Sequence, residues 1–154
     1  MSAVDVVTAV EIFHEYDDGG RAAAGFRGDA GDCVTRAIAI AGRLDYRTVY
    51  DDLAARQAAR GQSRSARNGV DPAVFRAWFA DNGWVWTACT GIGQGCRVHL
   101  RAAEVPTRGS HVMRLSRHLC AVVDGVVRDT HDPSRSGTRC VYGYWTAPEG
   151  KATP

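Results

Sequence analysis

The spacing of hydrophobic residues predicts a helix that begins at Cys33. Its apolar residues recur three or four positions apart and share one face: Val34, Ile38 and Ala41. Asp32 precedes them as the expected N-cap, and Gly42 follows as the expected C′ residue. Residues 22–30 are small and include glycines, so we expect a loop that leads the chain to Cys33.

Two further helices are predicted in the first half of the chain. Residues 46–60 place apolar side chains at i, i+3, i+4 and i+7: Tyr46, Val49, Tyr50 and Leu53. Asp71 followed by Pro72 is typical of a helix start, and this third helix is expected to end near Gly83. Residues 61–70 are polar and rich in Ser and Arg, so we expect a mobile surface loop between the two helices.

From Trp84 onward the pattern changes to short runs that favour strands. We predict strands over residues 84–89, 97–100, 112–115, 119–123, 126–130 and 140–145. Residues 4–13 are apolar and β-branched, which fits either a strand or a short helix. Because helices come first and antiparallel strands second, we expect one α+β domain over residues 1–154. Its core is expected within residues 24–146, followed by a tail over residues 147–154.

The dipeptide Asp124-Gly125 is the strongest hairpin signal in the chain. A two-residue turn at this dipeptide sets the pairs across the hairpin: Val123 with Val126, Cys120 with Asp129, and His118 with His131. His118 and Asp129 then share one face and lie on a diagonal, within reach of a carboxylate–imidazole contact. Asp132 faces the other side unless a bulge shifts the register.

The position of Cys33 gives its thiol a chemical role to test. A thiol at a helix N-terminus is biased toward thiolate, because the helix dipole and the free N–H groups favour negative charge. A helical cysteine is more often a small buried hydrophobic residue, and the charge of Asp32 would oppose a nearby thiolate. With His118 as a base and Asp129 to orient it, Cys33 suggests a cysteine-nucleophile enzyme. The other histidines with no evident partner are treated as structural or exposed: His14, His99 and His111.

Bulk composition narrows the remaining classes of function. The 154 residues are 45% hydrophobic with a formal net charge of +2, which makes no strong case for a nucleic-acid partner. The loop containing Arg64 and Arg67 could contact phosphate, although a solvated loop is the more common role. Residues 1–10 do not resemble a signal peptide, and no segment approaches the roughly 18 apolar residues of a membrane helix. We therefore expect a cytoplasmic protein with five reduced cysteines and no membrane partner.

A zinc site is the main chemical alternative. Cys89, Cys96 and His99 lie close in sequence, and Cys120 and Cys140 could add ligands. Structural zinc sites usually contain tighter Cys-x2–4-Cys pairs, which this chain lacks. Cys120 and Cys140 are instead expected to be buried strand residues, and we expect neither a metal nor a cofactor.

The order of these residues resembles the papain-like cysteine peptidase superfamily, in which a Cys at the start of the leading helix precedes His and then Asp or Asn on successive strands. The segment Asp129-Thr130-His131-Asp132 resembles the Asn-Ser-Trp-Gly segment of papain-type enzymes, with Asp129 at the Asn position. His118 with Asp132-Pro133 also resembles the peptidase domains of bacteriocin-exporting transporters, which would make Asp132 the third residue. The hairpin register favours Asp129.

A branch of bacterial and phage proteins shows similar motifs over residues 24–146. These motifs are Gly31-Asp32-Cys33-Val34-Thr35-Arg36-Ala37, Val122-Val123-Asp124-Gly125-Val126 and Tyr142-Gly143-Tyr144-Trp145. One position departs from the papain pattern. Papain-type enzymes have a Gln six residues before the Cys that completes the oxyanion hole, whereas this chain has Arg27.

The resemblance implies a papain-like fold, with N-terminal helices led by the Cys33 helix packed on a C-terminal antiparallel sheet. It implies a peptidase or amidase that forms a thioacyl intermediate on Cys33, with His118 as base, Asp129 as orienting residue and a peptide or protein as substrate. Acyl transfer to an acceptor other than water is left open. The alternatives are a catalytically inactive papain-like interaction module and a nucleic-acid-binding protein.

Overall fold

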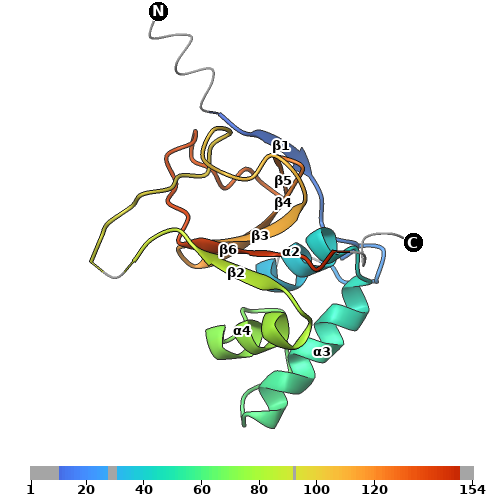
Figure 1. Ribbon diagram of the computed structural model, residues 1–154. Coiled ribbons are helices and arrows are strands. Elements are labelled where there is room, and N and C mark those ends of the chain that lie inside the picture. The colour runs from blue at the N-terminus through green and yellow to red at the C-terminus, as the bar shows by residue number, and fades with distance from the viewer. Residues whose placement is uncertain (1–10, 28–30, 92, 150–154) are drawn as a thin grey trace, which may run out of the picture.

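The computed structural model describes residues 11–27, 31–91 and 93–149. Over these residues the chain is an α+β protein with three helices and a six-stranded, mostly antiparallel sheet (Figure 1), which confirms the α+β part of the prediction. Within this part of the chain no helix is long and apolar enough to cross a membrane. The ambiguous segment over residues 4–13 lies almost wholly outside the described residues, as do residues 150–154 of the predicted tail.

The three predicted helices are present as α2 (Cys33–Gly42), α3 (Tyr46–Ala59) and α4 (Pro72–Asp81). Side-chain caps start two of them: Asp45 accepts a hydrogen bond from the backbone N–H of Thr48 in α3, and Asp71 accepts one from Ala73 in α4. These caps leave fewer unpaired N–H groups in the first turn, which is why the chain begins each helix at this point.

The predicted end of α2 is wrong by one residue. Arg43 rather than Gly42 adopts the left-handed conformation after the helix, with φ 53°. Gly42 is the last helical residue, and a Cβ there would lie 3.1 Å from both Leu44 and Trp84. Close packing therefore favours glycine at this position, and no C′ turn requires it.

The six strands form one sheet in the order β1-β5-β4-β3-β6-β2. Their bounds are β1 (Phe13–Tyr16), β2 (Val85–Ala88), β3 (Ser110–Leu115), β4 (His118–Val123), β5 (Val126–Asp129) and β6 (Gly143–Thr146). The predicted hairpin register is confirmed, because Val123 pairs with Val126 and Ala121 pairs with Arg128. The predicted strand over residues 97–100 is wrong, since only a single bridge between His99 and Cys140 forms there.

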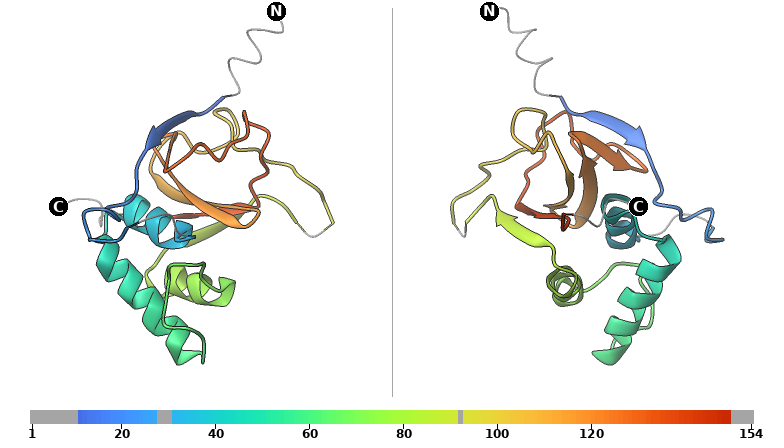
Figure 2. Two further views of the ribbon diagram at one scale, coloured as in Figure 1. Left: turned by 180° about the vertical axis from the view of Figure 1, so that it is seen from behind. Right: turned by 45° about the vertical axis from the view of Figure 1, so that its right-hand side comes forward.

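The sheet is curved (Figure 2). A hydrophobic cluster lies on each of its faces. One cluster joins α2, α3 and α4 to residues of the sheet such as Leu119 and Ala121. The other gathers residues such as Met113, Cys120 and Val122 under the long connections between β2 and β3 and between β5 and β6. The side chains of β4 alternate between these clusters, so this strand is buried on both faces.

Residues 61–70 are tied to the rest of the molecule at several points. Ala66 is fully buried, Gln57 donates to the carbonyl of Ser65, and Asn68 forms a backbone bridge with Gly31. The segment is thus anchored next to the start of α2, and its predicted mobility stays a prediction.

A disulfide between Cys96 and Cys140 contradicts the expectation of five reduced thiols and of a buried Cys140 without a covalent partner. Backbone hydrogen bonds lay residues 98–100 beside residues 139–141, which brings the two Cα atoms to 5.7 Å. This separation is typical of disulfides. The sequence did not reveal it because the two cysteines are 44 residues apart.

Candidate active site

Cys33 is the first residue of α2 and is half-buried against the sheet. The first N–H groups of a helix have no acceptor within the helix, so they present positive potential at this position. Asp32 occupies the N-cap position but makes no side-chain capping bond, which corrects the predicted cap. Its carboxylate instead pairs with the guanidinium groups of Arg21 and Arg36 and accepts a hydrogen bond from the hydroxyl of Tyr46.

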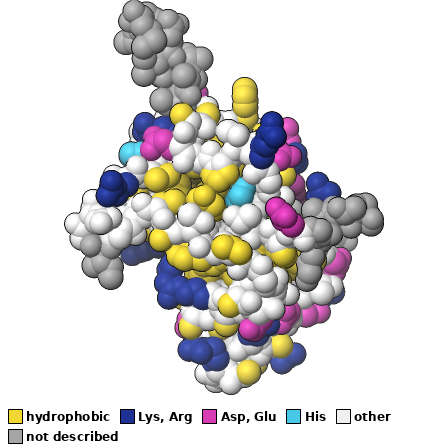
Figure 3. All heavy atoms as spheres, in the orientation of Figure 1, with side chains coloured by type: hydrophobic (Ala, Val, Ile, Leu, Met, Phe, Trp, Pro, Cys, Tyr) yellow, Lys and Arg dark blue, Asp and Glu magenta, His cyan; other side chains and the backbone are white. Residues whose placement is uncertain are grey.

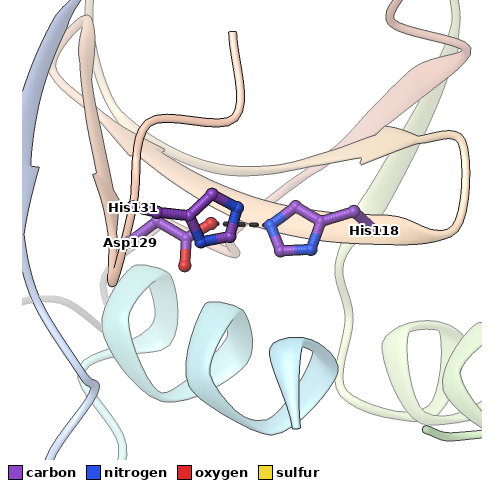
Figure 4. A group of neighbouring side chains, drawn as sticks. All are labelled: His118, Asp129 and His131. Carbon is purple, nitrogen blue, oxygen red and sulfur yellow. Dashed lines mark hydrogen bonds and ion pairs between the residues drawn. The ribbon is translucent and has the colours of Figure 1, made fainter. Parts of the chain in front are cut away.

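His118 and Asp129 form a direct pair at one end of the sheet. His118 is the first residue of β4 and Asp129 is the last residue of β5, so the hairpin brings them together. The Nε2 atom of His118 lies 2.6 Å from Oδ2 of Asp129 (Figure 4). Both side chains are largely buried, with exposed fractions of 12% and 3%, which shields the pair from water.

The thiol of Cys33 interacts with the same imidazole. Burial raises the pKa of Cys33, but the hydrogen bond to His118 and its positive charge, with help from the N–H of Leu119, lower that pKa below its usual range. Because Nε2 of His118 is bonded to Asp129, the remaining ring nitrogen, Nδ1, is the one left for the thiol.

The same contacts act on the histidine in the opposite direction. Burial lowers the pKa of His118, but the hydrogen bonds to Asp129 and Cys33 and their negative charges raise it to about 9. For Asp129, burial raises the pKa, and the bond to His118 and the nearby positive charges bring it below its usual range. The three groups therefore shift one another toward the thiolate, imidazolium and carboxylate forms.

Arg36 holds Asp129 in place from the helix side. Its guanidinium lies 3.2 Å from Oδ1 of Asp129 and also contacts Asp32. Burial lowers the pKa of Arg36, and the charges of Asp32 and Asp129 outweigh that effect and raise it. Arg36 was not among the predicted site residues. The available signal was an arginine four residues after Asp32, on a helix whose neighbouring positions are nearly all apolar.

Asp129 makes two further contacts, one through its side chain and one through its backbone carbonyl. Its Oδ1 accepts from the N–H of Thr130 at 2.7 Å, and its own carbonyl oxygen lies 2.9 Å from Nε2 of His14. His14, treated above as structural or exposed, is thus attached to the backbone of this site. Asp132 is exposed and accepts from the N–H of Ser134, and within the described residues no hydrogen bond or ion pair joins it to His118.

The described residues contain one group that could in principle hold a metal ion: His118, Asp129 and His131, whose ligand atoms lie within 4.8 Å of one another (Figure 4). The hydrogen bond to His118 occupies Oδ2 of Asp129, and Arg36 places a positive charge beside Oδ1. A cation at Asp129 would have to displace the hydrogen bond from His118 and bind beside the positive charge of Arg36. The arrangement fits a hydrogen-bonded acid–base pair better than a metal centre.

The cysteines and His99 considered as zinc ligands do not form one cluster among the described residues. Cys96 is bonded to Cys140 and His99 contacts Glu104. Cys89 and Cys120 are free, and burial raises the pKa of each thiol. Cys33 is therefore the only free thiol of the described residues whose pKa is lowered.

Cys33 and His118 lie where two cavities meet. One cavity, of about 300 Å³, is mainly apolar and is lined by residues such as Val70, Phe75 and Leu119. The other, of about 870 Å³, is more polar and reaches Arg27, Asn68 and His131. Since Cys33, His118, Gly69 and Arg117 line both, an extended molecule could pass over the thiol from one cavity into the other.

Comparisons with protein-family models, with curated proteins and with solved structures gave no match. The function is therefore inferred from the geometry and electrostatics of the site.

Replacing Arg36 should show how strongly the site depends on it. In Arg36→Met, Asp32 loses one of its cationic partners and Asp129 loses its guanidinium contact while both stay buried, so we expect the free energy of unfolding to fall by about 3–5 kcal/mol. Urea denaturation measures this change. Arg56→Met is the matched control, because Arg56 pairs with the more exposed Asp52 and Asp81. This variant should lower the free energy of unfolding by about 1 kcal/mol or less. Equal losses in the two variants would contradict the role given to Arg36.

The pH dependence of alkylation tests the ion pair. Iodoacetamide reacts with thiolate, so Cys33 should be labelled at about pH 6 faster than an ordinary thiol with a pKa of about 8.5. His118→Ala removes the main interactions that lower the pKa of Cys33 and should abolish this advantage. Labelling is followed by peptide mass spectrometry, with His131→Ala as control because His131 touches the His118 ring but is not among the groups that lower the pKa of Cys33. Labelling of Cys33 that follows the profile of an ordinary thiol would exclude the pair.

Proposed function

We propose that this protein is a papain-like cysteine hydrolase that cleaves a peptide or amide bond through a thioester on Cys33. The observation that carries the proposal is one imidazole placed between a thiol and a carboxylate. His118 contacts Cys33 and bonds Asp129 at 2.6 Å. A nucleophile, a base and a group that orients the base are the parts that covalent catalysis requires.

The reaction begins from the thiolate–imidazolium pair. The thiolate of Cys33 attacks the substrate carbonyl carbon, and the electron pair of the C=O bond moves to oxygen. As the tetrahedral intermediate collapses, the bond to the leaving nitrogen breaks and His118 gives that nitrogen its proton. The acyl group remains on Cys33 as a thioester.

Water completes the cycle from the same side. Neutral His118 takes a proton from water, hydroxide adds to the thioester carbonyl, and collapse expels the Cys33 thiolate with a carboxylic acid as product. Asp129 keeps the imidazole oriented through Nε2 and stabilises its positive charge. Arg36 acts as a positioning residue, because it touches Asp129 and not the reacting atoms.

The oxyanion needs hydrogen-bond donors near Cys33. The backbone N–H of Cys33 is one candidate, since Asp32 does not cap the helix. Arg27, which stands where papain-type enzymes have a Gln, is exposed, and its carbonyl accepts from Arg21. Asn68 is exposed as well, but its uncharged side-chain amide can donate, its backbone forms a bridge with Gly31, two residues before Cys33, and it lines the cavity with Cys33. We assign Asn68 as the second donor.

The proposal is tested with p-nitrophenyl acetate as an activated acyl probe. We expect steady release of p-nitrophenol, together with an acetyl group found on Cys33 by mass spectrometry. His118→Ala should lower the rate by at least about 100-fold, because general acid–base catalysis contributes roughly 10²–10⁴, and Cys33→Ala should remove the adduct. Acetylation without turnover would instead support the inactive module, and rates unaffected by His118→Ala would exclude the hydrolase.

The role of Asn68 makes a separate prediction. Loss of one oxyanion donor costs about 10²–10³ in kcat, so Asn68→Ala and Asn68→Asp should both lose that much turnover of p-nitrophenyl acetate. The rate of Cys33 alkylation should stay unchanged in Asn68→Ala, because His118 and not Asn68 lowers the thiol pKa. Parallel loss of alkylation and turnover would mean that Asn68 only supports the local structure.

A further inference from the structure

A third cavity, of about 380 Å³, lies between α4 and the strands β3, β6 and β2. It is lined by three tryptophans, two arginines and one alanine: Trp84, Trp86, Trp145, Arg76, Arg114 and Ala80. Its volume is in the range of small-molecule sites, roughly 300–1,000 Å³. Neither Cys33 nor His118 lines it.

The aromatic wall of this cavity is held rigidly. Trp145 stacks on Phe79 with ring centroids 4.2 Å apart, and Trp86 lies against Trp145 at 4.4 Å. The ring of Trp86 also lies over Gly143, where any Cβ would overlap it and approach the carbonyl of Thr87 at 2.7 Å. Trp86 is nevertheless 42% exposed, so an aromatic face is already ordered and open to solvent.

Two positive charges face this wall without an acidic neighbour. Arg114 sits on β3 between Gly143 of β6 and Leu119 of β4, neither of which can pair with it. Its guanidinium lies over the ring of Phe75 at 5.5 Å. Burial and the charge of Arg76 lower the pKa of Arg114, which shows that the two cations repel each other. The cavity lining includes no Asp or Glu.

The combination specifies a ligand chemistry. Flat indole surfaces favour an aromatic ring, and a guanidinium pair favours a carboxylate or phosphate that can accept several N–H bonds. The space-filling view shows basic side chains next to hydrophobic ones where β2 passes α4 (Figure 3). An anion between Arg76 and Arg114 would also remove their mutual repulsion.

We propose that this cavity is a binding site for a small aromatic anion, a flat ring that carries one carboxylate or phosphate. The ring lies against Trp86 and the anionic group between Arg76 and Arg114. This site does not depend on the proposed hydrolase function. Arg114 also lines the apolar cavity that reaches Cys33, so the bound anion lies at the border of that cavity.

Calorimetric titration with matched probes tests the site. Indole-3-acetate is compared with its neutral counterpart indole-3-acetamide and with acetate, and adenosine monophosphate is compared with adenosine and inorganic phosphate. We expect at least one aromatic anion to bind about tenfold or more tightly than both its neutral ring and its ring-free anion. Which of the two anions binds more tightly shows whether a carboxylate or a phosphate is the natural group.

Variants locate the binding. Arg76→Gln changes an exposed side chain and should weaken binding of the aromatic anion by about tenfold without affecting the fold. Trp86→Ala should weaken binding by a similar factor, because it removes the exposed aromatic face. Arg64→Gln, another exposed arginine distant in sequence, is the control and should bind normally. The proposal is overturned if no aromatic anion binds below about 10 mM, if the neutral rings bind as tightly, or if Arg76→Gln binds like the control.

Discussion

The buried guanidinium of Arg36 is the contact on which the candidate site depends. It joins Asp32, immediately before α2, to Asp129, at the end of β5. Burying one cation and two carboxylates is costly unless each is paired, so these charges hold the helix and the hairpin in one relative position. Cys33 follows Asp32 directly, and His118 is bonded to Asp129. The ion network therefore sets where the thiol and the imidazole meet.

Much of this arrangement could be predicted from local sequence. The cap at Asp71 and the periodicity of residues 46–60 fixed two helices, and the Asp124-Gly125 turn fixed the hairpin register. Because strand side chains alternate with a period of two, this one turn was enough to place Asp129 on the same face as His118 and Asp132 on the other face. These features depend on neighbours within a few residues, which a single sequence records.

The features that were missed all depend on distant parts of the chain. The parallel pairing of β1 with β5 has no local signal, since Phe13 and Tyr16 of that strand are 81% and 72% exposed. The Cys96–Cys140 disulfide and the contact between Arg36 and Asp129 join residues far apart in sequence. The capping role expected of Asp32 failed because its carboxylate is occupied by Arg36 in the next turn and by Arg21 and Tyr46 from outside the helix.

Asp129 and Cys33 together favour the imidazolium form of His118 at neutral pH. An NMR titration of the His118 ring measures this directly. We expect a pKa of about 9 in the natural protein and a lower value in Cys33→Ala, which removes one of the two hydrogen bonds that raise it. Titration of His118 near the ordinary value of about 6.5, unchanged by Cys33→Ala, would show that the thiol and the carboxylate do not hold the imidazole in this way.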